Sequence, residues 1–424
     1  MRRQEAWLVA FCVGDVFAAA LAMGVVSLQM KALGLGPAAA GLVGSVYGAL
    51  QTVSGPVAGW ASDTYGRKVL LCGACAGIAV GYALLAAAAL VGEADAGGGA
   101  PGGVRGAAVG LLVLSRAVTG ATKHTASTSK ALAADATRSV GRGARASLLG
   151  RMNMGASLGF MVAPLLSARL LEATGSYAAP AALASVAFAA LVPVAAAAAD
   201  ASGDAGTSGG KSGQSRAESS PLKGVRALLA APRVRALLAC RLCLGIGVSV
   251  FRQAMQLLFT YHFELDARQQ GYITAAFSLL GALSQGLGVA PVQRRLGTEK
   301  AYAAGLALLA VCYGLIASAG NLWMFLAVVP AIGLVAGLAR PLGAALLTHS
   351  APAAATGQAL AAADVIMSLA RAGAPVAAGA AVALSPSGAA VGAPAAAALL
   401  VGAAAFIAFY LPPEEGNDNG KKND

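Results

Sequence analysis

Long apolar segments, separated by short polar ones, follow one another along almost the whole chain. A helix that crosses the hydrocarbon core of a bilayer needs about 20 mostly apolar residues. With that window the chain divides into six predicted spans, a polar interruption and six more. The spans lie near residues 6–30, 38–60, 69–92, 107–131, 147–171, 177–199, 235–261, 269–291, 301–319, 322–347, 357–384 and 389–411. The pattern therefore predicts an all-α membrane protein with twelve transmembrane helices.

The polar interruption predicts a boundary between two domains. Residues 200–232 are rich in Gly, Ser and charge and cannot bury enough apolar surface to fold, which is typical of a flexible linker. Residues 412–424 have a similar composition and predict a polar tail. The rest of the chain forms two predicted six-helix bundles, at 1–199 and 233–411.

The fifth and eleventh spans look like copies of one another. Ser157 and Pro164 of the fifth span are each followed, 211 positions later, by Ser368 and Pro375 of the eleventh. Proline removes a hydrogen bond from a helix interior and bends the helix, so we expect Pro164 and Pro375 to shape equivalent helices. Two pseudo-symmetric six-helix repeats around a long linker are typical of transporters whose halves rock against each other.

Composition favours lipid as the main solvent. Apolar residues make up 58% of the 424-residue chain and charged residues 11%, whereas a soluble domain carries roughly 25% charged residues. The net charge of +12 does not indicate nucleic-acid binding, because the basic residues lie between apolar segments. Most basic residues outside the spans fall on one side of the predicted membrane, and the other side holds Lys31, Arg105, Arg169 and Arg268. The positive-inside rule then places both termini and the linker in the cytoplasm.

Two cysteine pairs have the spacing of metal or redox motifs, Cys72 with Cys75 and Cys240 with Cys243. The sequence around them offers no matching set of further ligands, so inert buried thiols are the favoured interpretation. We predict no metal and no cofactor. The sequence also shows no nucleophile–base pairing and no convincing phosphate-binding glycine loop. It therefore predicts a protein that is not an enzyme and that uses an ion or proton gradient rather than ATP.

A ten-residue motif from Gly59 to Lys68 lies in the short loop between spans two and three and reads GxxxDxxGRK. Gly59 would let a neighbouring helix approach closely, and Gly66 would allow a tight turn with positive φ. Asp63 is expected to pair with Arg67, while the cations hold the loop at the cytoplasmic face. The alternative is an ordinary loop that is basic by topology alone.

This motif resembles the signature of the major facilitator superfamily at every signature position. The resemblance implies a fold of two six-helix bundles, a transport function, and a role for the loop as a latch that stabilises one access state. The equivalent loop between spans eight and nine keeps Gly297, but Arg294 stands in place of the acid and Glu299 in place of the final cation, so it resembles a degenerate copy.

Segments of the first five spans narrow the resemblance. The resemblance is to one branch of the superfamily, which includes the orphan major facilitator superfamily domain-containing protein nine, the tetracycline-efflux proteins and the organic-cation-transporter-like proteins. It is carried by Gly14-Asp15, the stretch 45–51 and Lys123-His124. The antiporter signature of that branch in span five is present only in part, around Pro164. That departure weakens an antiport interpretation.

Charges inside the spans need a reason, because an ionisable residue at the bilayer centre costs about 2.5–3.5 kcal/mol even on a lenient scale. In the superfamily, helices one, four, seven and ten line the central cavity. The resemblance places five deep charges on those helices: Asp15, Arg116, Lys123, Arg252 and Arg340. One acid against four bases predicts a cavity that attracts an anion. For Asp15, a structural hydrogen bond and a proton or cation site both remain open.

Two further positions accompany the charges of span four. His124 follows Lys123 directly, and Gly120 lies four residues after Arg116. The pattern Arg116-xxx-Gly120 resembles a basic motif that the superfamily associates with proton coupling. In span eleven, Asp364 and Arg371 share one helical face, where an internal salt bridge or helix contact is the expected role.

Three functions follow as hypotheses. The first is a proton-coupled carrier of a small organic anion, in which Arg252 and Arg340 hold the acidic group and Asp15 or His124 titrates. The second is a multidrug-like proton antiporter that exports amphiphilic or cationic compounds. The third is a receptor or scaffold that kept the fold without transport. In each case the predicted surroundings are a lipid bilayer, the predicted state is a monomer, and a small solute is the expected partner of a carrier.

Overall fold

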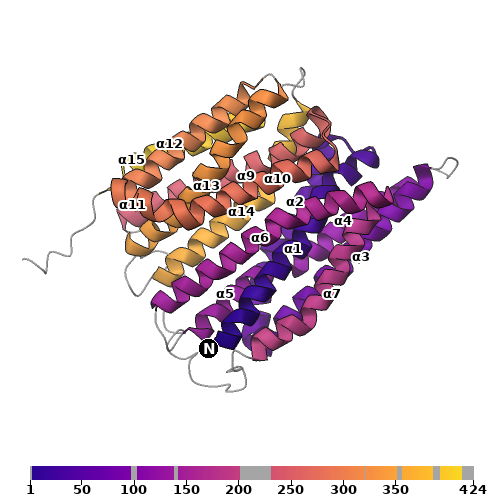
Figure 1. Cartoon of the computed structure of the whole chain (residues 1–424), viewed down its shortest axis with the longest axis horizontal. Coiled ribbons are helices and arrows are strands. Elements are labelled where there is room, and N and C mark those ends of the chain that lie inside the picture. Colours follow the sequence, from indigo (N-terminus) through magenta and orange to yellow (C-terminus); the bar gives the residue numbers. More distant parts are fainter. Residues whose placement is uncertain are drawn as a thin grey trace, which may run out of the picture.

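The computed structural model describes residues 2–96, 103–137, 142–200, 231–319, 321–350, 356–384 and 392–412, and all regular structure in these ranges is helical (Figure 1). The predicted linker and tail fall almost wholly outside the described residues. The helices are α1 (Arg2–Ala32), α2 (Pro37–Tyr65), α3 (Arg67–Ala96), α4 (Gly103–Thr122), α5 (Thr125–Ala136), α6 (Arg142–Thr174), α7 (Ala178–Asp200), α9 (Pro232–Leu257), η2 (Leu258–His262), α10 (Ala267–Leu283), η3 (Ser284–Gly288), α11 (Val289–Leu296), α12 (Thr298–Ala317), α13 (Leu322–Ser350), α14 (Thr356–Ala383) and α15 (Gly392–Phe409).

These elements account for all twelve predicted spans. Span four is α4 followed by α5, span seven is α9 with the π-helical turn η2, and span eight is α10, η3 and α11 in succession. By length and composition alone, eleven helical segments of the described chain could cross a membrane. The exception is α2, which is 29 residues long but carries several Gly, Ser, Thr and Gln residues. Those residues lower its mean hydropathy, and some of them, such as Gly41 and Gly48, pack against α14.

Buried apolar side chains form two cores, one for each half of the chain. The first is built mainly by residues before Asp200, with Phe11 and Phe188 among its largest members. The second is built by residues after Pro232 and includes Tyr302 and Tyr313. In Figure 1 the indigo-to-magenta helices and the orange-to-yellow helices accordingly gather on opposite sides. We call these groups the N-terminal half and the C-terminal half.

The halves meet where small residues let helix backbones touch. A Cβ atom on Gly48 of α2 would lie 2.7 Å from Cα of Ala372 in α14, and one on Gly379 of α14 would lie 2.6 Å from the carbonyl oxygen of Pro37. The carbonyl of Pro375 lies against Gly41 of α2, and the carbonyl of Pro164 lies against Gly271 of α10. The two prolines that the repeat pairs therefore occupy equivalent places, each beside a glycine of the opposite half.

Several hydrogen bonds between the halves lie at one end of the molecule, which we call the distal side because it holds the Gly34 turn between α1 and α2. There Lys31 Nζ donates to Glu264 Oε1 at 2.8 Å and to the carbonyl of Thr260 at 3.0 Å. Tyr261 Oη donates to the carbonyl of Leu35 at 2.7 Å. These bonds tie α1 and its turn to η2 and the loop that follows it.

The opposite end holds the Gly66 turn, and we call it the latch side. Its ion pairs among described residues join helices of the same half: Glu5 with Arg151, Arg67 with Asp135, Lys68 with Asp200, and Arg233 with Glu299. The described conformation is therefore tied across the halves at the distal side, while the ion pairs of the latch side stay within each half.

Candidate solute site and latches

A buried ion pair lies inside the N-terminal half. Asp15 is in the middle of α1, and Lys123 lies in the break between α4 and α5. Lys123 Nζ donates to Asp15 Oδ1 at 2.5 Å and to Thr125 Oγ1 at 3.1 Å, and it lies 4.8 Å from the ring centroid of Phe188. The Asp15 and Lys123 side chains are only 8% and 13% exposed. The acid and one of the four predicted bases therefore neutralise each other.

The helix break that presents Lys123 is held by α2. Without helical continuity the carbonyl of Lys123 needs another donor, and Gln51 Nε2 supplies it at 2.8 Å. His124 Nε2 lies 2.8 Å from Ser54 Oγ, which donates its own proton to the carbonyl of Leu50 at 2.6 Å. Because a hydroxyl has one proton, His124 Nε2–H is the donor in this bond. His124 thus binds α2 rather than Asp15.

Arg116 occupies a second position inside the N-terminal half. Its guanidinium carbon lies 5.9 Å from the ring centroid of Tyr47, and its Nε and Nη2 are buried with no hydrogen-bond partner among the described residues. Gly120, one turn later, lies so close to α2 that a Cβ atom there would be 2.5 Å from the carbonyl oxygen of Tyr47. The small residue at 120 therefore allows the close packing of α4 on α2 that puts Arg116 beside Tyr47.

Three arginines of the C-terminal half lie close enough for their charges to interact. The positive charge of Arg252 in α9 is repelled by those of Arg340 in α13 and Arg371 in α14. The charge of Arg340 is also repelled by those of Arg371 and Arg241. The side chains of Arg252, Arg340 and Arg371 are all exposed although they lie mid-helix. Among the described side chains none of these arginines has an ion-pair partner. We call Arg252, Arg340 and Arg371 the arginine cluster.

The arginine cluster reaches the boundary between the halves. The guanidinium of Arg252 lies 5.1 Å from the ring centroid of Phe160, which belongs to α6 of the N-terminal half. Arg371 Nη2 donates to Ser368 Oγ at 3.1 Å. The side chain of Asp364, the expected partner of Arg371, is outside the described residues. The expected salt bridge or helix contact stays a prediction, and Arg371 was not among the residues predicted to line the cavity. The feature of the sequence that points to Arg371 is its position in the middle of a predicted span.

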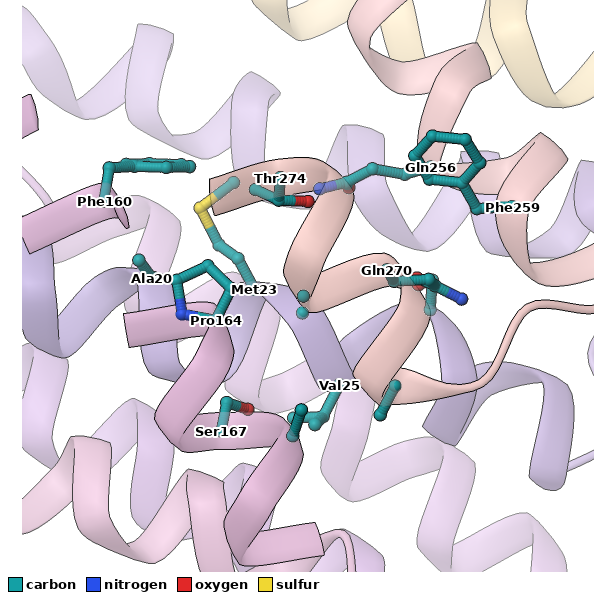
Figure 2. A pocket seen from close by; sticks show the side chains of 15 residues that line it. Ala20, Met23, Val25, Phe160, Pro164, Ser167, Gln256, Phe259, Gln270 and Thr274 are labelled. Atoms are coloured by element: carbon teal, nitrogen blue, oxygen red, sulfur yellow. The ribbon is translucent and has the colours of Figure 1, made fainter. Parts of the chain in front are cut away.

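A small cavity opens beside Phe160, between α1, α6, α9, η2 and α10 (Figure 2). Met23 and Phe160 contribute apolar surface, and Gln256 and Gln270 contribute amides. Ser167 Oγ lies in its wall, buried and with no hydrogen-bond partner among the described atoms. This cavity was not predictable from local sequence, because its walls come from three separate parts of the chain, residues 20–27, 160–168 and 256–274.

In the first latch the expected turn is present and one expectation fails. Gly66 has φ +87°, which confirms the predicted turn. Arg67 Nε pairs with Asp135 Oδ2 of α5 at 2.8 Å, and Lys68 Nζ pairs with Asp200 at the end of α7, at 2.6 and 2.8 Å from its two oxygens. The side chain of Asp63, predicted to hold Arg67, is outside the described residues. The close helix approach expected at Gly59 is wrong for this structure, because Gly59 is exposed and a Cβ atom there would meet nothing within 4 Å.

The second latch keeps the turn and reverses the charge. Gly297 has φ +74° and ψ 160°, close to the values of +87° and 155° at Gly66. Two residues after the glycine, Glu299 replaces the cation of the first latch and pairs with Arg233 at the start of α9. Arg233 also donates to Ser350 Oγ at 3.0 Å and to the carbonyl of Pro412 at 2.8 Å. A loop that looks degenerate by sequence is therefore an ion-paired turn of opposite polarity.

The sequence profile described as Major Facilitator Superfamily matches residues 6–251 and 237–424. The chain belongs to this superfamily. The two matches each cover one half of the chain, in agreement with the two cores and the two latch turns. The predicted all-α fold and the multi-pass membrane character are confirmed.

Relatives and solved structures agree with this membership. The chain is 27% identical over 278 residues to human "Solute carrier family 67 member A1", a match that spans 65% of this chain and 61% of that relative. It is similar in fold to the human organic anion transporter MFSD10 (TETRAN), with TM-score 0.65, 20% identity, and 96% of this chain and 99% of that one covered. A bacterial homologue of the iron transporter ferroportin gives TM-score 0.70 and 15% identity, with 97% and 99% covered.

The cysteines of this superfamily member form no disulfide, and Cys12 and Cys75 lie near the buried pair of Asp15 and Lys123. All six are free thiols, and Cys240 Sγ contacts Tyr302 Oη at 3.5 Å and the carbonyl of Ala404 at 3.3 Å. Within the described ranges no group of three or more His, Cys, Asp and Glu residues is placed to hold a metal ion. The chemistry that the geometry offers is therefore that of charged and hydrogen-bonding side chains.

Proposed function

We propose that this chain is a secondary active transporter of a small organic anion, with Arg252 and Arg340 as its anion-binding residues. The observation that carries the proposal is the arginine cluster, whose charges have no acid partner among the described side chains. An uncompensated cation is costly inside a membrane protein, and a bound anion relieves that cost. The similar fold of MFSD10, a human organic anion transporter, supports the same substrate class.

Access alternates by rocking of the two halves. With both termini and the latch side in the cytoplasm, the described conformation faces inward, because the halves are tied together at the distal side. The opposite state requires Lys31 to leave Glu264 and α2 to separate from α14 at Gly48. We infer that the monomer performs this cycle in the bilayer without a cofactor.

Coupling to a proton gradient is assigned to the buried pair of Asp15 and Lys123. A proton taken up by Asp15 removes the charge that holds Lys123, so the break between α4 and α5 can respond to it. His124 is a less direct candidate, because its Nε2–H is engaged by Ser54. The pair thus links protonation to the same helix that carries Arg116.

Transport by purified protein in proteoliposomes tests the proposal. Uptake of a panel of labelled organic anions is measured with an imposed pH gradient, for the wild type and for Arg252→Gln and Arg340→Gln. We expect each substitution to lower uptake of the transported anion at least about tenfold, as a lost charge-assisted contact of about 1.4 kcal/mol requires. Arg295→Gln, at the exposed end of α11, is the control and should leave uptake unchanged. Unchanged uptake of every anion in both cluster variants would refute the proposal.

The same assay separates the proposal from export of amphiphilic or cationic compounds. The apolar walls of the small cavity, with Met23, Phe160 and Phe259, are the observation that favours such a substrate. Proton-driven exchange of a lipophilic cation, with anion uptake absent, is the result that this second candidate predicts.

A glycine substitution tests the rocking step. In Gly48→Leu the side chain collides with α14, because even a Cβ atom would lie 2.7 Å from Cα of Ala372. We expect distal closure to be lost, and a cysteine introduced on the distal part of α2 to become reactive toward a membrane-impermeant thiol reagent. Gly55→Leu on the same helix is the matched control, since nothing lies within 4 Å of its Cβ position. Equal reactivity in the two variants would contradict the assignment of this contact as a gate.

A further inference from the structure

The arginine cluster holds more positive charge than a single acidic group can balance. Arg252, Arg340 and Arg371 each lie at least ten residues, or roughly 15 Å, from either end of their helical spans. At that depth their guanidinium groups cannot reach the membrane surface by extending along the helix. Each one repels at least one of the others. The cluster therefore requires counter-charge at its own level.

The described part of the chain does not supply that counter-charge. Asp15 is engaged by Lys123 at 2.5 Å. Glu264 and Asp266 lie at the distal side, and Glu299 lies at the latch side, where it pairs with Arg233. Among the described side chains no acid pairs with the three guanidinium groups, so a bound solute can bring negative charge there.

Arg371 is placed where it can contact a bound solute. Its side chain is exposed, and its backbone lies against the N-terminal half, because a Cβ atom on Gly48 would be 2.9 Å from the Arg371 carbonyl oxygen. Arg252 faces the same boundary through Phe160. A guanidinium presents a planar fork of donors that matches a carboxylate or phosphate group, so two such forks at one boundary can hold two acidic groups.

We propose that the solute is an organic dianion, carrying either two carboxylates or one phosphomonoester, and that Arg371 selects for its second negative charge. This inference rests on the proposed function and names its substrate class. A monoanion satisfies one guanidinium and leaves two like charges facing each other. A dianion satisfies two, so the occupied site is closer to neutral.

Matched ligands that differ by one charge provide the test. Binding to the purified full-length protein is measured calorimetrically for succinate against monomethyl succinate, and for phenyl phosphate against methyl phenyl phosphate. A series of dicarboxylates from succinate to sebacate varies the distance between the two carboxylates of the ligand. We expect at least one dianion to bind about tenfold more tightly than its monoanionic partner. In Arg371→Gln that preference should fall to about twofold or less, with monoanion affinity nearly unchanged, and Arg371→Lys should restore part of it.

The possible outcomes separate this inference from the proposed function. Equal binding of monoanions and dianions, with both lost in Arg252→Gln, overturns the dianion and leaves an anion transporter. Binding of none of these anions counts against both. A preference for dianions that persists in Arg371→Gln, with an unchanged melting temperature, overturns the role of Arg371. Arg295→Gln should behave as the wild type throughout.

Discussion

The N-terminal half brings Lys123 to 2.5 Å from Asp15 and closes both charges off from solvent, whereas the C-terminal half leaves Arg252, Arg340 and Arg371 exposed to one another without an acid among the described side chains. A buried pair resists separation, because each partner left alone is an uncompensated charge. A cluster of like charges is under repulsion and gains from a ligand of opposite sign. The comparison teaches that the N-terminal half holds its charges as a buried neutral pair, whereas the C-terminal half leaves exposed charges that we propose bind a solute.

The largest effect should come from breaking the pair. Lys123→Ala leaves Asp15 buried without a partner, and we expect it to lower the free energy of unfolding by about 3–5 kcal/mol. Thermal unfolding of the purified protein measures the loss. The double variant Asp15→Asn with Lys123→Met should recover most of it, because it removes both charges. A single variant as stable as the wild type would show that the pair does not hold α1 to the break in span four.

In the arginine cluster, removal of one charge should not lower the free energy of unfolding. Arg340→Gln removes a repelling charge, so the free energy of unfolding should stay within about 0.5 kcal/mol of the wild type or rise. The same thermal measurement, made without ligand, checks it. A loss of several kcal/mol would mean that Arg340 has a structural partner and that the contrast between the halves is false.

We expect the smallest effect on stability from the exposed pair of Lys31 and Glu264, which joins the halves at the distal side. The hydrogen bond from Lys31 lowers the pKa of Glu264 below its ordinary value of 4.5. The stabilising contribution is therefore present above that value and is lost as the pH falls through the lowered pKa. We expect a small difference in melting temperature between the wild type and Glu264→Gln at pH 7, shrinking steadily below about pH 4.5. A difference that grows on acidification would reverse the sign and exclude this linkage.

The spans were predictable because the bilayer imposes one local requirement, a run of about 20 apolar residues, and even α2 shows it weakly. The Gly66 turn was predictable because only a glycine adopts its φ readily. Contacts between helices were not. The partner of Lys123 lies 108 positions away, and Asp135, which pairs with Arg67, lies on another helix. Such contacts depend on how each helix is rotated and packed, which the period of apolar residues leaves open.

The break between α4 and α5 was also missed, for a different reason. It contains neither Gly nor Pro, and its sequence, Lys123-His124, continues an otherwise apolar helix. Its backbone is sustained from outside, by the amide of Gln51. Helix breaks of this kind are properties of a pair of helices, so one helix read alone does not reveal them.

The two latch turns carry a consequence for tracing internal duplication. Gly66 and Gly297 share nearly the same backbone conformation, yet the charge two residues later is positive in one and negative in the other. A motif search that requires a positive residue two positions after the glycine does not find the second turn. A search for a left-handed glycine between two long helices, followed at a fixed interval by any ionisable residue, recovers both. Within this chain the two repeats share the backbone turn, whereas the sign of the charge beside it differs.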